Sequence, residues 1–118
     1  MEISGREVNG WSLFELDGSF DLHSIHDIKN LFKHLCHQPN NIIFDFSKVK
    51  KIDSSGISCL LYGQKLLKRF NKEFRITRLK NDIKIIFQVT RGFESFDIFD
   101  EIEKAAESIE KISSKQVA

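Results

Sequence analysis

The chain has 118 residues, 41% of them hydrophobic and 30% charged, and its formal net charge is +1. This length and composition predict one globular domain over residues 1–118 and exclude an intrinsically disordered chain. A net charge near zero gives no general attraction to nucleic acid or to an anionic membrane, so neither is expected as a direct partner. No stretch approaches the ~20 apolar residues of a membrane span, and no signal peptide is recognisable, which favours a cytoplasmic protein.

Strand-like and helix-like stretches alternate along the chain, which is typical of an α/β domain. Residues 2–8 predict a weak first strand, and Asn9-Gly10 is a strong signal for a hairpin turn. A second strand is expected over residues 11–18. The two strands should therefore pair as a hairpin at the start of the chain.

The first helix is expected over residues 24–37. Ser24, followed three residues later by Asp27, resembles a capping box with Asp in place of the usual Glu, and Pro39 ends the helix. Cys36, and Cys59 in the next helix, are expected to be reduced core residues rather than a disulfide. At 100° per residue the apolar side chains gather on one face; they are Ile25, Ile28, Leu31, Phe32, Leu35 and Cys36.

The remaining elements follow from the same patterns. Residues 42–46 are nearly all apolar, which predicts a central strand covered on both faces. A second helix is expected from the Asp53-Ser54 step to about Phe70, and its core stripe comprises Gly56, Cys59, Leu60, Gly63, Leu66, Leu67 and Phe70. We further expect a strand near 74–77, a helix over 82–90, a strand over 96–99 and a helix near 101–112. The inward side of that last helix is Ile102, Ala105, Ala106 and Ile109, and the final five or six residues should fray.

The clearest functional signal lies where the third strand meets the second helix. Asp53, Ser54 and Ser55 suit a helix start, because their side-chain oxygens accept hydrogen bonds from the unpaired amides of the first turn. A simple helix cap would explain these residues by itself. A phosphate on Ser54 would face the positive end of the helix dipole, so the fold should also tolerate a phosphorylated serine here.

Two apolar residues of this helix, Ile57 and Leu61, do not join its core stripe. On a helical wheel they lie beneath Ser54, on the same side as Ser58 and Lys65. Branched apolar residues on a solvent-facing side beside a modifiable hydroxyl predict a docking patch for another protein. The alternative is that a neighbouring element covers them. A phosphate would add about −1.5 to −2 charges to such a patch and would dissolve the contact.

The stretch from 42 to 63, IIFDFSKVKKIDSSGISCLLYG, resembles the central segment of STAS domains, in particular those of bacterial anti-sigma factor antagonists. In that family an apolar strand leads to an Asp-Ser-Ser/Thr/Ala-Gly motif that opens a helix. Residues 17–21 resemble the family's Gly-x-φ-Asp turn (φ apolar), and residues 91–99 resemble its C-terminal Gly-Leu-Asp…Phe segment. The resemblance implies an α/β fold with a four- to five-stranded mixed sheet, packed on one side by helices, about four in all.

The resemblance also implies a function. In the family, the serine at the position of Ser54 is phosphorylated by a partner that is both an anti-sigma factor and a serine kinase. The unphosphorylated form binds that kinase and releases a sigma factor, and a PP2C-type phosphatase restores it. We accordingly expect a regulatory protein rather than an enzyme, without catalytic residues or cofactor, and a monomer or weak dimer. The expected partner-binding residues are Asp21, Asp53, Ser55, Gly56, Ile57, Ser58, Leu61 and Lys65.

At several positions the sequence differs from the family pattern, and these differences affect which partner is expected. Ser58-Cys59 stands where many members have Gly and an aliphatic residue, and Ser19-Phe20 replaces a common Glu-Leu or Glu-Ile. The segment 91–99 is one residue shorter than usual. These differences leave room for a target other than an inhibitor of a sigma factor.

Two alternative functions belong to other classes. One is a STAS scaffold that is not phosphorylated, such as a stressosome-like or transporter-regulating module that acts by assembly or by binding a small ligand. The other is a small enzyme that uses Asp53 and Ser54. The sequence lacks a Gly-x-Ser-x-Gly elbow and a Gly-x-x-x-x-Gly-Lys phosphate loop, which disfavours hydrolase and nucleotide chemistry.

The chain also contains a group of histidines and a short basic run. The four histidines, His23, His26, His34 and His37, fall on the polar side of the first helix, and a structural zinc site needs about four ligands in a closed shell, so no metal is expected. The basic run of Lys48, Lys50 and Lys51 is expected either to be a solvated loop or to attract an acidic kinase surface or ATP phosphates.

Overall fold

Five strands form one mixed sheet in the order β1-β2-β3-β4-β5 in this computed structural model, which describes residues 1–107. β1 runs antiparallel to β2, whereas β2, β3, β4 and β5 run parallel to one another. The strands are β1 (Glu2–Val8), β2 (Trp11–Phe20), β3 (Ile42–Ile52), β4 (Phe74–Thr77) and β5 (Asp97–Phe99). The α/β class and the mixed sheet expected from the sequence are confirmed.

Five helices occur among residues 1–107, where about four were expected for the whole chain. They are α1 (Leu22–Leu35), α2 (Ser54–Arg69), α3 (Asn81–Val89), α4 (Gly92–Ser95) and α5 (Ile102–Ala105). The extra helix is α4, a single turn that was not predicted. The expectations for Ile109, for the end of the last helix and for the fraying of the tail lie outside the described residues.

The first hairpin turns as predicted. Asn9 and Gly10 have φ angles of 50° and 83°, and positive φ at both central residues is the requirement of a type I′ turn. Pairing of β1 with β2 is continuous from Glu2 opposite Asp17 to Val8 opposite Trp11. β1 is therefore a regular edge strand without a bulge.

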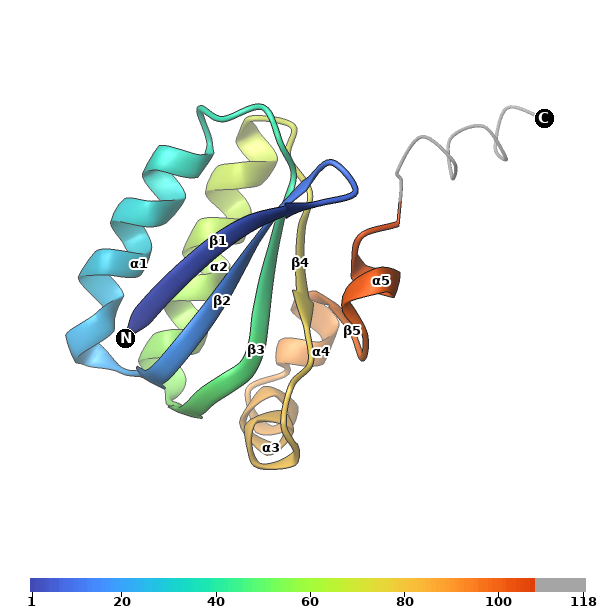
Figure 1. Ribbon diagram of the computed structural model, residues 1–118. Coiled ribbons are helices and arrows are strands. Elements are labelled where there is room, and N and C mark those ends of the chain that lie inside the picture. Colours follow the sequence, from blue (N-terminus) through green and yellow to red (C-terminus); the bar gives the residue numbers. More distant parts are fainter. Residues whose placement is uncertain (108–118) are drawn as a thin grey trace.

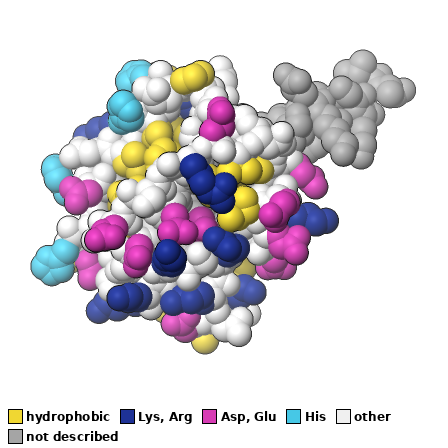
Figure 2. Space-filling model, in the orientation of Figure 1, with side chains coloured by type: hydrophobic (Ala, Val, Ile, Leu, Met, Phe, Trp, Pro, Cys, Tyr) yellow, Lys and Arg dark blue, Asp and Glu magenta, His cyan; other side chains and the backbone are white. Residues whose placement is uncertain are grey.

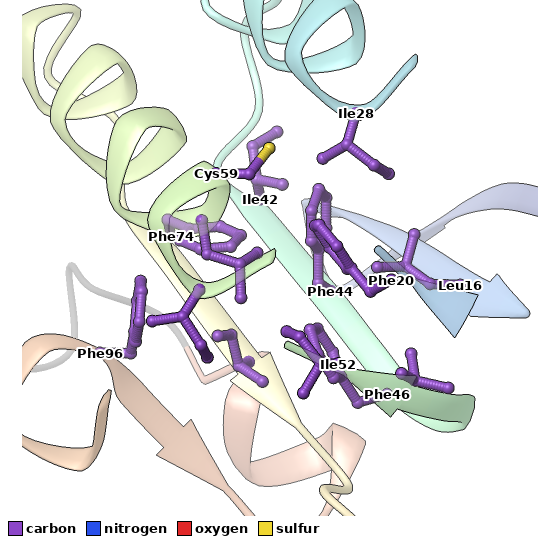
Figure 3. Close-up of a cluster of buried hydrophobic side chains, with 14 of the residues drawn as sticks. Leu16, Phe20, Ile28, Ile42, Phe44, Phe46, Ile52, Cys59, Phe74 and Phe96 are labelled. Atoms are coloured by element: carbon purple, nitrogen blue, oxygen red, sulfur yellow. The ribbon is translucent and has the colours of Figure 1, made fainter. Parts of the chain in front are cut away.

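The main core lies between the sheet and the helices α1 and α2, which run side by side on one face (Figure 1). Figure 3 shows the buried side chains of β2, β3 and β4 pointing toward those of the helices. The Phe44 ring lies 5.2 Å from that of Phe32 and 5.0 Å from that of Phe74, so aromatic rings fill much of this layer. A Cβ on Gly63 would stand 2.2 Å from the Phe32 ring, so only glycine permits this close approach of α2 to α1.

A second, smaller core lies on the opposite face of the sheet, where Trp11, Leu13 and Ile43 pack against Ala105 and Ala106. The expectation that helices cover one side only is therefore incomplete, because α5 covers part of the other face. The buried Arg75 holds α5 in place: its guanidinium lies 4.5 Å from the centre of the Trp11 ring and donates to the carbonyl oxygen of Ala105 at 3.0 Å.

β3 is longer than expected, because residues 47–52 continue the strand in which only 42–46 were predicted. Val49 and Ile52 are buried while Lys48, Lys50 and Lys51 are exposed. The lysines therefore lie along a strand that is half covered, and they are not part of a loop. This extension carries the chain to the start of α2.

Candidate functional site

The candidate site lies at the end of the sheet where β2 and β3 both finish. These parallel strands are paired as far as Phe20 opposite Ile52, so the next residues, Asp21 and Asp53, emerge at the same edge. Each of these two residues is the N-cap of the helix that follows it. Two helix N-termini, each with its partial positive charge, therefore open on one edge of the molecule.

The cap of α1 differs from the prediction. The N-cap is Asp21 rather than Ser24, and the helix begins two residues earlier than expected. The Asp21 carboxylate accepts a hydrogen bond from the backbone N–H of His23 at 3.0 Å, while the Ser24 hydroxyl accepts one from the backbone N–H of Asp21 at 3.1 Å. Ser24 is thus the reciprocal partner in a capping box, and Asp27 takes no part in it.

The cap of α2 is the one that the sequence predicted. The Asp53 Oδ1 atom accepts from the backbone N–H of Gly56 at 3.0 Å and from the hydroxyl of Ser55 at 2.5 Å. These donors, the Ser55 hydroxyl first, lower the pKa of the Asp53 carboxyl below its ordinary value. Asp53 is exposed and remains a carboxylate at neutral pH.

Ser54 is the first residue of α2, and its side chain is exposed. Within residues 1–107 its hydroxyl makes no hydrogen bond to another side chain or to the backbone. Ser55, by contrast, is half-buried, and its hydroxyl donates to Asp53. Of the two serines, Ser54 offers the free hydroxyl at the helix start.

Gly56 is buried beneath the first turn of α2. A Cβ at this position would stand 2.6 Å from Cγ1 of Ile52 and 2.9 Å from the carbonyl oxygen of Phe20. Real Cβ atoms do not approach backbone oxygens that closely, so glycine is needed to seat α2 on the ends of β2 and β3. The structure places Gly56 in this packing rather than on the surface expected to contact a partner.

The predicted exposure of Ile57 is wrong. Its side chain is only 4% exposed and belongs to the main core, so the alternative that a neighbouring element covers it applies. Leu61 is half-buried against the same core, while Ser58 and Lys65 are exposed. A helical wheel assumes one buried stripe, and α2 is covered over a wider arc than that. The expected contact surface is reduced to Ser58 and Lys65, with Leu61 at its margin.

The sequence did not single out Leu22, the first residue of α1, whose side chain is 74% exposed. It follows Asp21 directly, so it lies at the same edge as Ser54. A single exposed leucine is common on protein surfaces, and only its place beside the start of α2 makes Leu22 a candidate contact for a protein partner. The sequence offered one sign of this exposure: Leu22 lies outside the apolar stripe of the first helix.

The three lysines of the basic run, Lys48, Lys50 and Lys51, differ in whether they form a salt bridge. The Lys48 ammonium lies 3.1 Å from a carboxylate oxygen of Glu15, which raises the pKa of the lysine. Lys50 and Lys51 are exposed and form no salt bridge with residues 1–107. These two lysines are the positive charges still available near the start of α2.

The histidines and cysteines form no metal site among the residues described. All four histidines are exposed on or just after α1, and residues 1–107 contain no group of three or more His, Cys, Asp or Glu that could hold a metal ion. Cys36 and Cys59 are buried free thiols, as predicted, and burial raises the pKa of Cys59 to about 11. None of the helices described has the length and apolarity needed to cross a membrane.

Comparison with known proteins places this geometry in a family. The sequence model of the STAS domain matches residues 2–105. Among solved structures, an anti-sigma factor antagonist from Mycobacterium paratuberculosis is similar, with a TM-score of 0.78 and 14% identity over 88% of this chain and 89% of that one. The Bacillus cell fate determinant SpoIIAA in its phosphorylated form has a TM-score of 0.63 and 17% identity over 99% of this chain and 100% of that one.

A third similar structure is described as a transporter family protein rather than as an anti-sigma factor antagonist. A sulfate transporter family protein from Wolinella succinogenes has a TM-score of 0.70 and 18% identity over 80% of both chains. At these identities the likeness of the structures concerns the fold. The match over residues 2–105, in contrast, covers most of the sequence.

Proposed function

Because this chain belongs to the STAS domain family, we propose that it is a switch of the anti-sigma factor antagonist kind, controlled by phosphorylation of Ser54. The unphosphorylated form binds a partner that is both an anti-sigma factor and a serine kinase, and this binding releases a sigma factor. Phosphate on Ser54 ends the binding, and a PP2C-type phosphatase removes it. The protein acts in the cytoplasm by binding rather than by catalysis.

The observation that carries the proposal is the free, exposed hydroxyl of Ser54 at the first position of α2. A kinase must bring a serine hydroxyl in line with the γ-phosphate of ATP, which requires an accessible and unbonded oxygen. Ser55 does not meet this requirement, because its hydroxyl is engaged by Asp53. The phosphorylated form of SpoIIAA, a protein of similar fold, is consistent with a phosphate in this family.

The surroundings of Ser54 explain how one phosphate could act without refolding the domain. The positive ends of α1 and α2 tolerate the added charge, while the carboxylates of Asp21 and Asp53 on the same edge oppose it. Because the attraction to the helix N-termini and the repulsion from the two carboxylates oppose each other, the fold stays the same in the phosphorylated and unphosphorylated forms. The charge would act on the partner instead, because it would stand beside the exposed Leu22 in a contact that excludes water.

The contact surface of the proposal is built from residues that are exposed or half-buried around the start of α2. It comprises Leu22, Ser58 and Lys65, with Asp21, Asp53 and Ser55 framing the serine and Leu61 at the margin. Gly56 and Ile57 support this surface from below. Lys50 and Lys51 lie on the approach to the site and would favour the encounter with an acidic kinase.

The test is the intact mass of the protein after incubation with ATP and a lysate of its own organism. Ser54→Ala is the test variant and Ser55→Ala is the matched control, since the two serines are neighbours and only one is free. We expect the wild type and Ser55→Ala to gain one phosphate and Ser54→Ala to gain none. Phosphate on Ser54→Ala, or its absence from the wild type, would contradict the proposal.

A second candidate is a STAS scaffold that works by assembly. Its support is a set of exposed apolar side chains on α3 and α4: Ile85 is 57% exposed, Val89 73% and Phe93 43%. Side chains of this size on the surface favour an additional protein contact. In this case Ile85→Ser and Val89→Ser would abolish assembly, and Ser54 would gain no phosphate in the wild type or in either variant.

A further inference from the structure

The two edges of the sheet are protected to different degrees. β5 is an edge strand of three residues, whereas β1 is an edge strand of seven residues that pairs with β2 without a bulge. β1 lies at the edge of the sheet (Figure 1), and its residues 4–7 are all exposed. Natural proteins protect such edges with charged side chains, above all lysine, or with proline, bulges or short strands. β1 has no lysine, proline or bulge, and its only such device is the charge of Glu2, Arg6 and Glu7.

The hydrogen-bonding groups on this edge can be assigned from the hairpin. In a two-residue type I′ hairpin the flanking residues, Val8 and Trp11, form a hydrogen-bonded pair, and hydrogen-bonded positions then alternate along the strand. The backbone groups of Arg6, Ser4 and Glu2 consequently face β2. Those of Ile3, Gly5 and Glu7 face outward, away from the sheet.

Two of the charges on β1, Glu2 and Arg6, have no partner of opposite charge within residues 1–107. Glu2 stands directly opposite Asp17 of β2, which places two carboxylates side by side, and Arg6 stands opposite the apolar Leu13. Neither Glu2 nor Arg6 forms a salt bridge with residues 1–107. The side chains of Glu2 and Arg6 lie on the same face of the sheet, because alternate residues of a strand point the same way. Figure 2 shows acidic and basic side chains gathered on one face of the molecule.

We infer that β1 pairs with β1 of a second copy of this chain, antiparallel and with Ser4 on the two-fold axis, to give a sheet that continues through both molecules. In this register Glu2 of each copy stands opposite Arg6 of the other, twice per dimer. Each Glu2 thereby gains the cation that Asp17 does not supply. Ile3 of each copy exchanges hydrogen bonds with Gly5 of the other, about four bonds in all.

The local shape favours the same register. The ring of Phe14 lies over Gly5, since a Cβ there would stand 2.9 Å from Cε1 of Phe14. Opposite this glycine, Ile3 of the second copy meets a surface without a side chain of its own and can rest on the ring. A pairing centred on Gly5 instead would place Arg6 opposite Ser4 and Glu7 opposite Ile3, which leaves every charge unpaired.

The contact is a single strand pair, much smaller than the interface of a permanent dimer, so the dimer is weak and sensitive to salt. It does not involve Ser54, and it stands independently of the proposed phosphorylation. The measurement is sedimentation equilibrium of the purified protein up to millimolar concentration, at low and at high salt. A wild type that stays monomeric throughout would overturn the inference.

Charge reversal tests the register. Arg6→Glu and Glu2→Arg each place like charges opposite one another twice, so each should raise the dimer dissociation constant about tenfold. The double variant Glu2→Arg with Arg6→Glu restores opposite charges and should restore the wild-type constant. Failure of the double variant to recover would show that the copies pair elsewhere or in another register.

A cysteine on the axis gives an independent readout. Residues at a non-hydrogen-bonded antiparallel pair have Cα atoms about 4.5 Å apart, which lies within the range of a disulfide. Ser4→Cys should therefore form a disulfide-linked dimer under mild oxidation, whereas the matched control Arg6→Cys should not, because it faces Glu2. Equal cross-linking of the two variants would contradict the register.

Discussion

Replacement of Asp53 tests whether the carboxylate that frames Ser54 also holds the start of α2. Asp53→Ala removes the acceptor for the Gly56 N–H, at 3.0 Å, and for the Ser55 hydroxyl. Loss of an N-cap of this kind costs about 1 kcal/mol, within a range of about 0.5–2. In a domain of this size that corresponds to a fall in the midpoint of thermal unfolding of about 4 °C.

The assay is urea unfolding at pH 7, with Asp53→Asn as the matched control. An Asn side chain accepts the same hydrogen bond without the charge, so this variant should retain most of the stability that the Ala variant loses. An unchanged urea midpoint for Asp53→Ala, or an Asn variant as unstable as the Ala variant, would refute the assignment of the cap.

The pH dependence of this effect has a defined sign. The pKa of Asp53 is lowered in the folded state, so its charge stabilises the fold above the ordinary pKa of an aspartate, about 4. This contribution disappears as the pH falls through the lowered pKa. The difference in stability between the wild type and Asp53→Asn should therefore be present at neutral pH and should disappear as the pH falls through the lowered pKa of Asp53.

Three further substitutions have expected outcomes. Gly63→Ala forces a Cβ to within 2.2 Å of the Phe32 ring and should destabilise the fold by about 1–3 kcal/mol in urea unfolding, and a neutral result would contradict the packing of α1 on α2. Arg78→Ala leaves the carboxylate of Asp45, which is 1% exposed, without its ion-pair partner. Because Arg78 is itself 40% exposed, the loss of stability in urea unfolding should be about 2 kcal/mol, and an unchanged stability would contradict the role of this pair. Leu22→Ala should weaken binding of the partner kinase about tenfold in a titration without lowering the thermal midpoint, and equal affinity would remove Leu22 from the contact surface.

Much of the fold follows from local pattern. The hairpin at Asn9-Gly10, the apolar run of β3 and the cap at Asp53 are each determined by neighbouring residues, and each was predicted. The start of α1 was not, because Asp21 and Ser24 are both good capping residues. The choice between them depends on where β2 ends, and β2 continues to Phe20 because it pairs with β3 that far.

The errors at the site come from contacts between distant parts of the chain. Ile57 lies off the stripe that a helical wheel assigns to the core, yet tertiary packing buries it, while Phe70 on the expected stripe is 43% exposed. The cover that α5 gives to the second face depends on Arg75, a charged residue that stacks on Trp11. A hydrophobic pattern gives no indication that such an arginine is buried.

The most direct test of the switch uses the kinase that phosphorylates this protein and compares its affinity for two forms of the chain. One form carries phosphate on Ser54 alone, and the other is unmodified, with both measured by calorimetry in the presence of the same nucleotide. The account predicts that phosphate weakens binding at least a hundredfold, about 3 kcal/mol, while the thermal midpoint of the isolated protein changes little. Equal affinity of the two forms for the kinase would contradict it.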